Sequence, residues 1–218
     1  MTIPATIDVR ISDHLTPATP ATRRAAVVIA LLFLGATATF LIGDALVVRA
    51  LDGPVVDRGG LLLGVALQTV NALAVAGLGL AFLRVLPVDV RRLALGHLAL
   101  RIVEAVVIIG LGGWMIATES LVDYEPVIYV FTGGAGLLLT AALARTRLIE
   151  RPLVLLGTVG YVAILSALPV QLLTSASLDG FPGLLLYVPG ALFELTLPLL
   201  LLARGFRATA PGRRGDGV

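Results

Sequence analysis

The sequence of 218 residues contains no cysteine, and its sixteen basic residues are all arginine. Without cysteine, the chain has no disulfide framework, no thiolate metal site and no cysteine nucleophile. Charged residues are also scarce, at 14%, whereas a soluble domain has about 25%. A composition this poor in charge argues against an ordinary soluble domain.

Apolar residues take the place of the missing charge. They make up 58% of the chain, and the mean hydropathy is +1.01. Runs of about 20 apolar residues recur, each long enough to cross a hydrocarbon core of about 30 Å. They predict an all-α fold, a bundle of six transmembrane helices at residues 25–48, 61–83, 93–116, 127–144, 152–174 and 183–203. The bundle is expected to occupy residues 23–206, with disordered tails at 1–22 and 207–218, and Pro169 predicts a kink.

The distribution of arginine predicts the orientation of the bundle. Thirteen arginines flank alternate helix ends: Arg10, Arg23, Arg24, Arg84, Arg91, Arg92, Arg145, Arg147, Arg151, Arg204, Arg207, Arg213 and Arg214. The opposite loops contain only Arg49 and Arg58. The positive-inside rule therefore predicts that both termini and their tails lie in the cytoplasm, and it explains the basic pI without a nucleic-acid partner. An aromatic belt is expected at the outer interface, formed by Trp114, Tyr124, Tyr129 and Tyr187.

The third apolar run carries three polar side chains on one helical face. His97, Arg101 and Glu104 follow one another at positions i, i+4 and i+7. A charge at the middle of a bilayer costs about 2.5–3.5 kcal/mol, so such residues face the bundle interior and have partners there. At 1.5 Å per residue, Arg101 lies roughly 12 Å and Glu104 roughly 16 Å from the cytoplasmic surface.

Glu194 in the last run is also predicted to lie roughly 16 Å deep, measured from the outer surface at which that helix enters the membrane. The simplest arrangement has Arg101 bridging Glu104 and Glu194, with Gln68 and Asn71 of the second helix completing the hydrogen bonds. One cation and two anions leave a surplus negative charge, which a proton on a carboxyl group, a proton on His97 or a bound cation would relieve. Pro198 removes the helical partner of the Glu194 carbonyl.

Two passages, RTRLIERPLVLLGTVGY at 145–161 and PGALFELTLPLLLLARGF at 189–206, carry a family resemblance. With LRIVEAVVI at 100–108, they resemble the bacterial integral-membrane family of unknown function numbered four-three-eight-six. The resemblance spans about residues 20–207, and it implies that Glu104 and Glu194 occupy the family's acidic positions in the third and last helices. Glu150 stands where the family has proline, and Pro198-Leu199-Leu200 replaces a stretch with tryptophan. The resemblance implies an architecture and no activity.

The residues favour no enzyme class. No HExxH, GxSxG or paired-aspartate motif is present, and no cofactor is expected. His97 and Glu104 could supply two metal ligands, but no third is evident, so no metal site is predicted. The glycine patches at 110–113 and 132–136 indicate close helix packing. An intramembrane enzyme stays open only if the two glutamates line a deep cavity.

Two functions therefore remain for a protein of the bacterial cytoplasmic (inner) membrane. In the first, the Arg/Glu cluster binds a small ligand, proton or cation, in the course of transport. In the second, the cluster is structural and the chain is a non-catalytic assembly or accessory subunit. The lipid bilayer is an expected partner, nucleic acid is not, and a small ligand or cation, a second copy or another membrane protein remain open as partners.

Overall fold

The computed structural model describes residues 20–122, 124–174 and 181–207, and within these residues the chain is helical with no strand. The elements are α1 (Pro20–Leu51), α2 (Arg58–Val85), a single 3-10 turn η1 (Val88–Val90), α3 (Arg91–Thr118), α4 (Glu125–Thr146), α5 (Arg151–Leu165), α6 (Ala167–Thr174) and α7 (Phe181–Arg204). The all-α prediction is confirmed.

Six stretches of helix are long and apolar enough to cross a bilayer. They are Arg23–Leu51, Arg58–Val85, Val88–Thr118, Pro126–Thr146, Arg151–Leu173 and Leu185–Arg204. Each contains one of the six expected runs almost entirely, because the length of an apolar run sets the length of a spanning helix. Residues 1–19 and 208–218 of the predicted tails lie outside the described residues, and residues 20–22 already belong to α1.

The fifth span is broken where proline predicts it. Pro169 lacks the N–H that would donate to the carbonyl of Leu165, and its ring crowds that carbonyl. The helix α5 accordingly ends at Leu165, and α6 begins at Ala167, two residues before the proline. Ser166 closes the turn between them, since its N–H donates to the carbonyls of Val162 and Ala163.

Local residues also fix the ends of the other helices. The side chain of Asp57 accepts a hydrogen bond from the N–H of Gly60 and caps α2. A proline stands in the first turn of α4 and of α5, where its missing N–H is not needed. Glu119 and Arg147 end α3 and α4 in the left-handed backbone region, at φ values of 52° and 53°.

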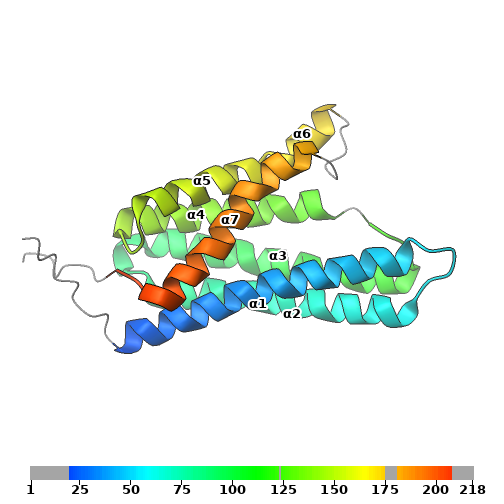
Figure 1. Ribbon diagram of the computed structural model, residues 1–218, viewed down its shortest axis with the longest axis horizontal. Coiled ribbons are helices and arrows are strands. Elements are labelled where there is room, and N and C mark those ends of the chain that lie inside the picture. Colours follow the sequence, from blue (N-terminus) through cyan, green and yellow to red (C-terminus); the bar gives the residue numbers. More distant parts are fainter. Residues whose placement is uncertain (1–19, 123, 175–180, 208–218) are drawn as a thin grey trace, which may run out of the picture.

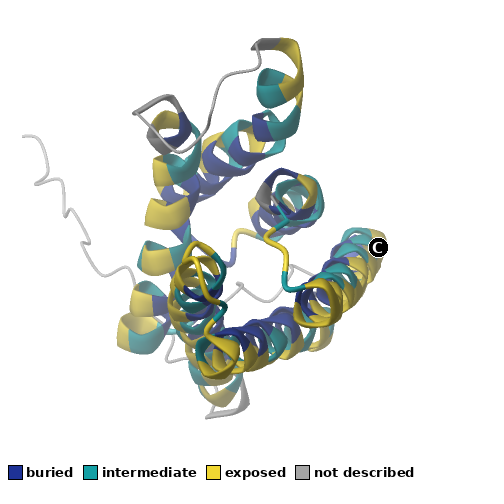
Figure 2. Ribbon diagram, turned by 90° about the vertical axis from the view of Figure 1, so that its right-hand side faces the viewer, coloured by how far each residue is buried: buried dark blue, intermediate teal, exposed yellow. Residues whose placement is uncertain are grey.

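The six spans form a closed ring. Each span packs on the one before it, in the order α1, α2, α3, α4, α5 and α7, and α7 packs back on α1 (Figure 1). Seen along the bundle, buried residues lie on the inner sides of the helices and exposed residues on the outer sides (Figure 2). Neighbouring spans run in opposite directions. The start of α1 and the end of α7 therefore lie at the same end of the ring.

A charged side chain fastens the closure between α1 and α7. The guanidinium of Arg23 donates hydrogen bonds to the carbonyls of Leu201, at 3.1 Å, and Leu202. These carbonyls belong to the last turn of α7, where helical donors run out and a cation is favourable. The start of α1 and the end of α7 are thus joined at the arginine-rich end of the bundle.

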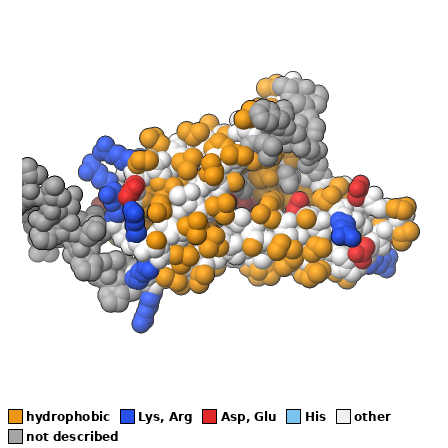
Figure 3. All heavy atoms as spheres, viewed as in Figure 1, with side chains coloured by type: hydrophobic (Ala, Val, Ile, Leu, Met, Phe, Trp, Pro, Cys, Tyr) orange, Lys and Arg blue, Asp and Glu red, His pale blue; other side chains and the backbone are white. Residues whose placement is uncertain are grey.

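The outside of the bundle is apolar, and its arginines gather mainly at one end (Figure 3). Side chains such as Leu31, Leu73 and Leu155 are more than half exposed, which suits contact with lipid. Inside, two separate apolar cores fill the two halves of the bundle. One contains Phe33, Phe82 and Phe193, and the other contains Val65, Ile108 and Met115. Polar side chains lie between these cores.

The expected aromatic belt is only partly present. Trp114 is 59% exposed, as a residue at the interface should be. Tyr124 is 5% exposed and points into the bundle, so its assignment to the belt is wrong. Tyr129 and Tyr187 are half-buried and stack on each other across α4 and α7, with ring centroids 4.9 Å apart.

Candidate functional site

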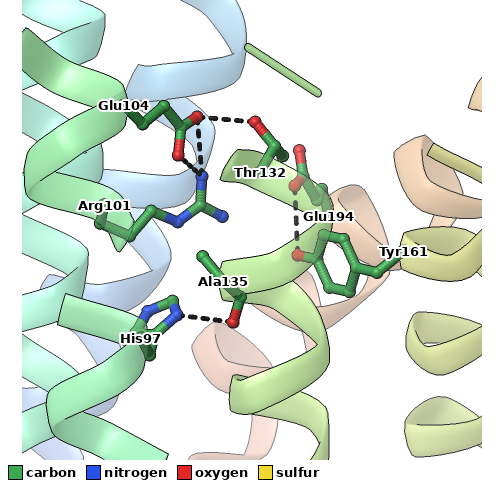
Figure 4. Close-up of polar contacts among 7 residues, drawn as sticks. All are labelled: His97, Arg101, Glu104, Thr132, Ala135, Tyr161 and Glu194. Carbon is green, nitrogen blue, oxygen red and sulfur yellow. Dashed lines mark hydrogen bonds and ion pairs between the residues drawn. The ribbon is translucent and has the colours of Figure 1, made fainter. Parts of the chain in front are cut away.

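A buried ion pair stands on α3 at the middle of the bundle. Arg101 and Glu104 are 2% and 3% exposed, and Nη1 of the arginine donates to both carboxylate oxygens, at 3.0 and 2.8 Å (Figure 4). Their spacing of three residues places both side chains on one helical face. The sequence prediction of a buried Arg101–Glu104 contact is confirmed.

One hydrogen bond ties the pair to α4, and a second ties the neighbouring His97 to the same helix. The hydroxyl of Thr132 donates to Oε1 of Glu104 at 2.7 Å. One turn below Arg101, Nδ1 of His97 lies 2.9 Å from the carbonyl of Ala135, and its ring packs edge-on against Phe82. A histidine nitrogen beside a carbonyl acts as the donor, so Nε2 of a neutral His97 is an acceptor. This Nε2 is buried without a hydrogen-bond partner.

Glu194 faces this pair from the opposite side of the ring, but its hydrogen bond goes elsewhere. The hydroxyl of Tyr161 on α5 donates to Oε1 of Glu194 on α7 at 3.1 Å (Figure 4). Within the described chain, no ion pair of 4.0 Å or less joins Arg101 to Glu194. The predicted bridge from Arg101 to both glutamates is therefore wrong for Glu194, because Arg101 pairs with Glu104. Four residues beyond Glu194, Pro198 lies inside α7 and leaves the Glu194 carbonyl without its helical donor.

Glycines allow Tyr161 and Glu194 to meet. A Cβ at Gly136 of α4 would overlap the ring of Tyr161, which is completely buried. A Cβ at Gly160 would stand 2.5 Å from the backbone nitrogen of Gly190, so α5 and α7 touch through their backbones. Glu194 lies one turn along α7 from this contact, within reach of Tyr161.

A second polar cluster joins α1, α2 and the start of α4. The hydroxyl of Tyr124 donates to Oδ1 of Asp44 at 2.9 Å and accepts from Nε2 of Gln68 at 3.0 Å. The expected role of Gln68 in the Arg/Glu cluster is therefore wrong. Asn71 is buried as well, yet within the described residues no hydrogen bond joins its side chain to either cluster.

We call the first group, formed by Arg101, Glu104, Thr132, Tyr161 and Glu194, the central cluster. It contains one guanidinium and two carboxyl groups in a medium of low dielectric constant. The guanidinium is committed to Glu104 through Nη1, and its Nε–H is buried without a partner. Glu194 has a hydroxyl donor but no cation in contact. Where it is charged, it carries the surplus negative charge that the sequence predicted.

Metal binding by the central cluster has little support. Across the described ranges, no group of three or more His, Cys, Asp or Glu side chains comes together. His97 points to Ala135, away from Glu104, so the two do not converge on one point (Figure 4). The carboxyl groups instead offer positions that a proton can occupy.

Sequence reasoning missed four residues of the two clusters. Thr132 was expected only to allow close helix packing, as part of the patch at 132–136, and Tyr124 only to belong to the aromatic belt. No role was predicted for Tyr161 or Asp44. A signal was present in the glycines, because Tyr161 follows Gly160 and Asp44 follows Gly43 directly. A polar side chain beside a close glycine contact lies at a helix interface.

Comparison of the chain with family models, curated proteins and solved structures finds no match. The fold and the two clusters therefore rest on the residues of this chain, and the resemblance to the bacterial membrane family stays a prediction.

Proposed function

We propose that this chain is a multi-pass transport protein of the bacterial cytoplasmic membrane and that Glu194 binds and releases a proton during transport of a small solute. The observation that carries the proposal is the pairing inside the bundle. Glu104 holds the only guanidinium of the central cluster, whereas Glu194 contacts a tyrosine hydroxyl.

The physical argument starts from the cost of an unpaired charge. A carboxylate in a low-dielectric interior without a cation in contact is costly, and protonation removes that cost. Glu104 does not need a proton, because Arg101 compensates its charge at hydrogen-bond distance. Glu194 does need one, and it is half-buried where Arg101 and Glu104 are fully buried.

The shape of α7 supports a role in transport. Transporters build their sites near the middle of the membrane from interrupted helices, whose free backbone carbonyls become ligands. Pro189 and Pro198 interrupt the hydrogen-bond ladder of α7 on either side of Glu194, and the fifth span is broken at Ser166. Glu194 and Tyr161 thus belong to the two spans whose backbones deviate from regular helix.

The orientation in the membrane is part of the same proposal, as is membership of the bacterial integral-membrane family that the sequence resembles. The described arginines at the ends of α2, α4 and α7, and at the starts of α3 and α5, gather at one end of the ring. The positive-inside rule assigns that end to the cytoplasm. Reporter fusions at each terminus test the assignment: a fluorescent protein at the C-terminus should fluoresce, and alkaline phosphatase at the same position should be inactive.

The test of proton binding is an infrared titration of the full chain in lipid. The wild type should show the C=O stretching band of one buried protonated carboxyl group, and this band should disappear in Glu194→Gln. Glu119→Gln, which changes a half-buried glutamate paired with Arg58, is the matched control and should keep the band. A wild type without the band, or a band that persists in Glu194→Gln, contradicts the proposal.

A structural role is the second candidate, and the hydrogen bonds of the central cluster favour it. They join α3 to α4 through Glu104 and Thr132, and α5 to α7 through Tyr161 and Glu194. If the chain is an accessory subunit, the central cluster serves to hold α3, α4, α5 and α7 together. Glu194→Gln should then lower the thermal stability while no carboxyl group titrates in the infrared experiment.

A further inference from the structure

The second cluster, Asp44, Tyr124 and Gln68, holds an acid without a basic partner. Asp44 is half-buried, and within the described residues its carboxylate accepts a single hydrogen bond, from Tyr124 to Oδ1. The other oxygen, Oδ2, accepts none there. No ion pair of the described chain involves Asp44. No described cation therefore pairs with the carboxylate of this cluster.

A second oxygen beside this acid is also unused. Gln68 is 2% exposed, and its amide nitrogen donates to the hydroxyl that binds Asp44. Its amide oxygen, Oε1, is buried with no hydrogen-bond partner. An unsatisfied buried acceptor destabilises the fold, so its retention beside a lone carboxylate points to a positively charged occupant.

The cluster can be reached from the end of the bundle opposite the arginine-rich end. A cavity of about 580 Å³ runs along the last two turns of α1 and is lined by Asp44, Val48, Arg49 and Asp52. The charges of Arg49 and Asp52 offset each other, so the net charge along this cavity is that of Asp44. The cavity therefore gives a hydrated cation access to the Asp44 side chain.

We propose that Asp44 and Gln68 form a site for a monovalent metal cation, separate from the central cluster. One carboxylate and one neutral amide oxygen match a single positive charge and are the hard oxygen ligands that alkali and alkaline-earth ions prefer. A divalent ion would need more carboxylates than the site has. Water from the cavity completes the coordination. Tyr124 positions both ligands, because its hydroxyl bonds to each.

The test uses thermal unfolding of the purified full chain in detergent, with Na⁺ as the probe. At constant ionic strength, replacing choline chloride by NaCl should raise the Tm in a saturable manner, since an ion that binds only the folded state stabilises it. Asp44→Asn keeps an acceptor for Tyr124 and should abolish the shift. Gln68→Leu should weaken Na⁺ binding about tenfold, the effect of one ligand contact.

Two controls separate this site from its surroundings. Asp52→Asn changes an exposed acid of the same cavity and should retain the Na⁺ shift. Glu194→Gln should also retain it, so failure of the proposed proton site and failure of this site are distinguishable. A Tm that rises equally in choline chloride and NaCl, or an Asp44→Asn protein that keeps the shift, overturns the proposal.

A measurement on the wild type removes any dependence on how Asp44→Asn folds. Dicyclohexylcarbodiimide modifies carboxyl groups within membrane proteins, and mass spectrometry locates the adduct. Na⁺ should slow the modification of Asp44 at least several-fold, and choline should not. Modification of Asp44 at equal rates in both salts would overturn the proposal.

Discussion

Two antiparallel helix pairs of the ring, α1 with α2 and α5 with α7, place polar side chains beside a glycine contact in the same way. In the first pair, a Cβ at Gly43 would lie 3.0 Å from the carbonyl oxygen of Gly64. Asp44 follows Gly43 directly, and Gln68 lies four residues after Gly64. The close contact of the two backbones brings these polar residues to one interface.

The second pair repeats this spacing with other side chains. Gly160 of α5 approaches Gly190 of α7, Tyr161 follows Gly160, and Glu194 lies four residues after Gly190. Both acids bond to a tyrosine hydroxyl. The difference lies in what stands nearby: the α5–α7 pair faces the Arg101–Glu104 ion pair, while the α1–α2 pair borders a cavity.

The comparison teaches that the same local packing can present an acid to two different occupants. Beside a compensated ion pair, the smallest cation, a proton, suffices for Glu194. Beside a cavity, Asp44 can take a metal ion with its water. The variants below test how far the two clusters differ, from the largest expected effect to the smallest.

Removal of Arg101 should have the largest effect. Arg101→Leu leaves the buried Glu104 carboxylate without its cation, and loss of one partner of a buried pair costs about 3–5 kcal/mol. Chemical unfolding in detergent measures the change. Replacing both Arg101 and Glu104 by leucine removes the charges together and should restore most of the stability. If Arg101→Leu is as stable as the wild type, the Arg101–Glu104 ion pair does not stabilise the bundle. The central cluster would then not differ from the Asp44 cluster in having a compensated charge.

Alanine at the glycine contacts should have the next effect. Gly160→Ala and Gly64→Ala each place a Cβ against backbone atoms of the neighbouring helix, and such overpacking costs about 1–3 kcal/mol. Gly110, which has open space around it, is the matched control. Gly110→Ala should be neutral or stabilising by up to about 1 kcal/mol. Equal unfolding free energies for all three variants would show that the close glycine contacts do not position the side chains of the two clusters.

The two tyrosines should come third. Tyr124→Phe removes the hydrogen bonds to Asp44 and Gln68, and Tyr161→Phe removes the one to Glu194. With interhelical hydrogen bonds worth about 0.6 kcal/mol on average, the losses should be about 1.2 and 0.6 kcal/mol. Thermal unfolding of the two variants side by side measures the order. A larger loss for Tyr161→Phe would mean that the neighbourhood of Arg101 strengthens the bond to Glu194.

The exposed ion pair between Arg58 and Glu119 should matter least. It joins the start of α2 to the end of α3, and the arginine side chain is 79% exposed. Exposed pairs contribute about 0–1 kcal/mol and are screened by salt. Arg58→Ala should therefore leave the unfolding free energy nearly unchanged, and the small loss should vanish at high ionic strength. A loss close to that of Arg101→Leu would remove the distinction between buried and exposed pairs.

Much of the fold could be predicted from the sequence, because bilayer thickness dictates the length of an apolar run. The break near Pro169 and the Arg101–Glu104 pair were equally accessible, since both depend on contacts within a few residues of one helix. Such contacts follow from helical geometry alone.

Contacts between helices could not be predicted in the same way. The partner of Glu194 depends on how far α7 is rotated about its axis, and that rotation is set by the contact of Gly190 with Gly160. Tyr124 was expected at the interface because tyrosine favours it, yet the chain between α3 and α4 turns back into the bundle and carries it to Gln68. Rotation and loop path arise from packing across the whole ring.

The contact of Arg23 with the last turn of α7 bears on how the protein is made. The acceptors Leu201 and Leu202 lie 178 and 179 positions after Arg23 in the chain. The ribosome has therefore produced all six spans before Arg23 can form these hydrogen bonds. Until then α2 is the one described span that packs on α1, because the other span in contact with α1 is α7. The six spans therefore form an open arc during synthesis, and the ring closes only when α7 is complete.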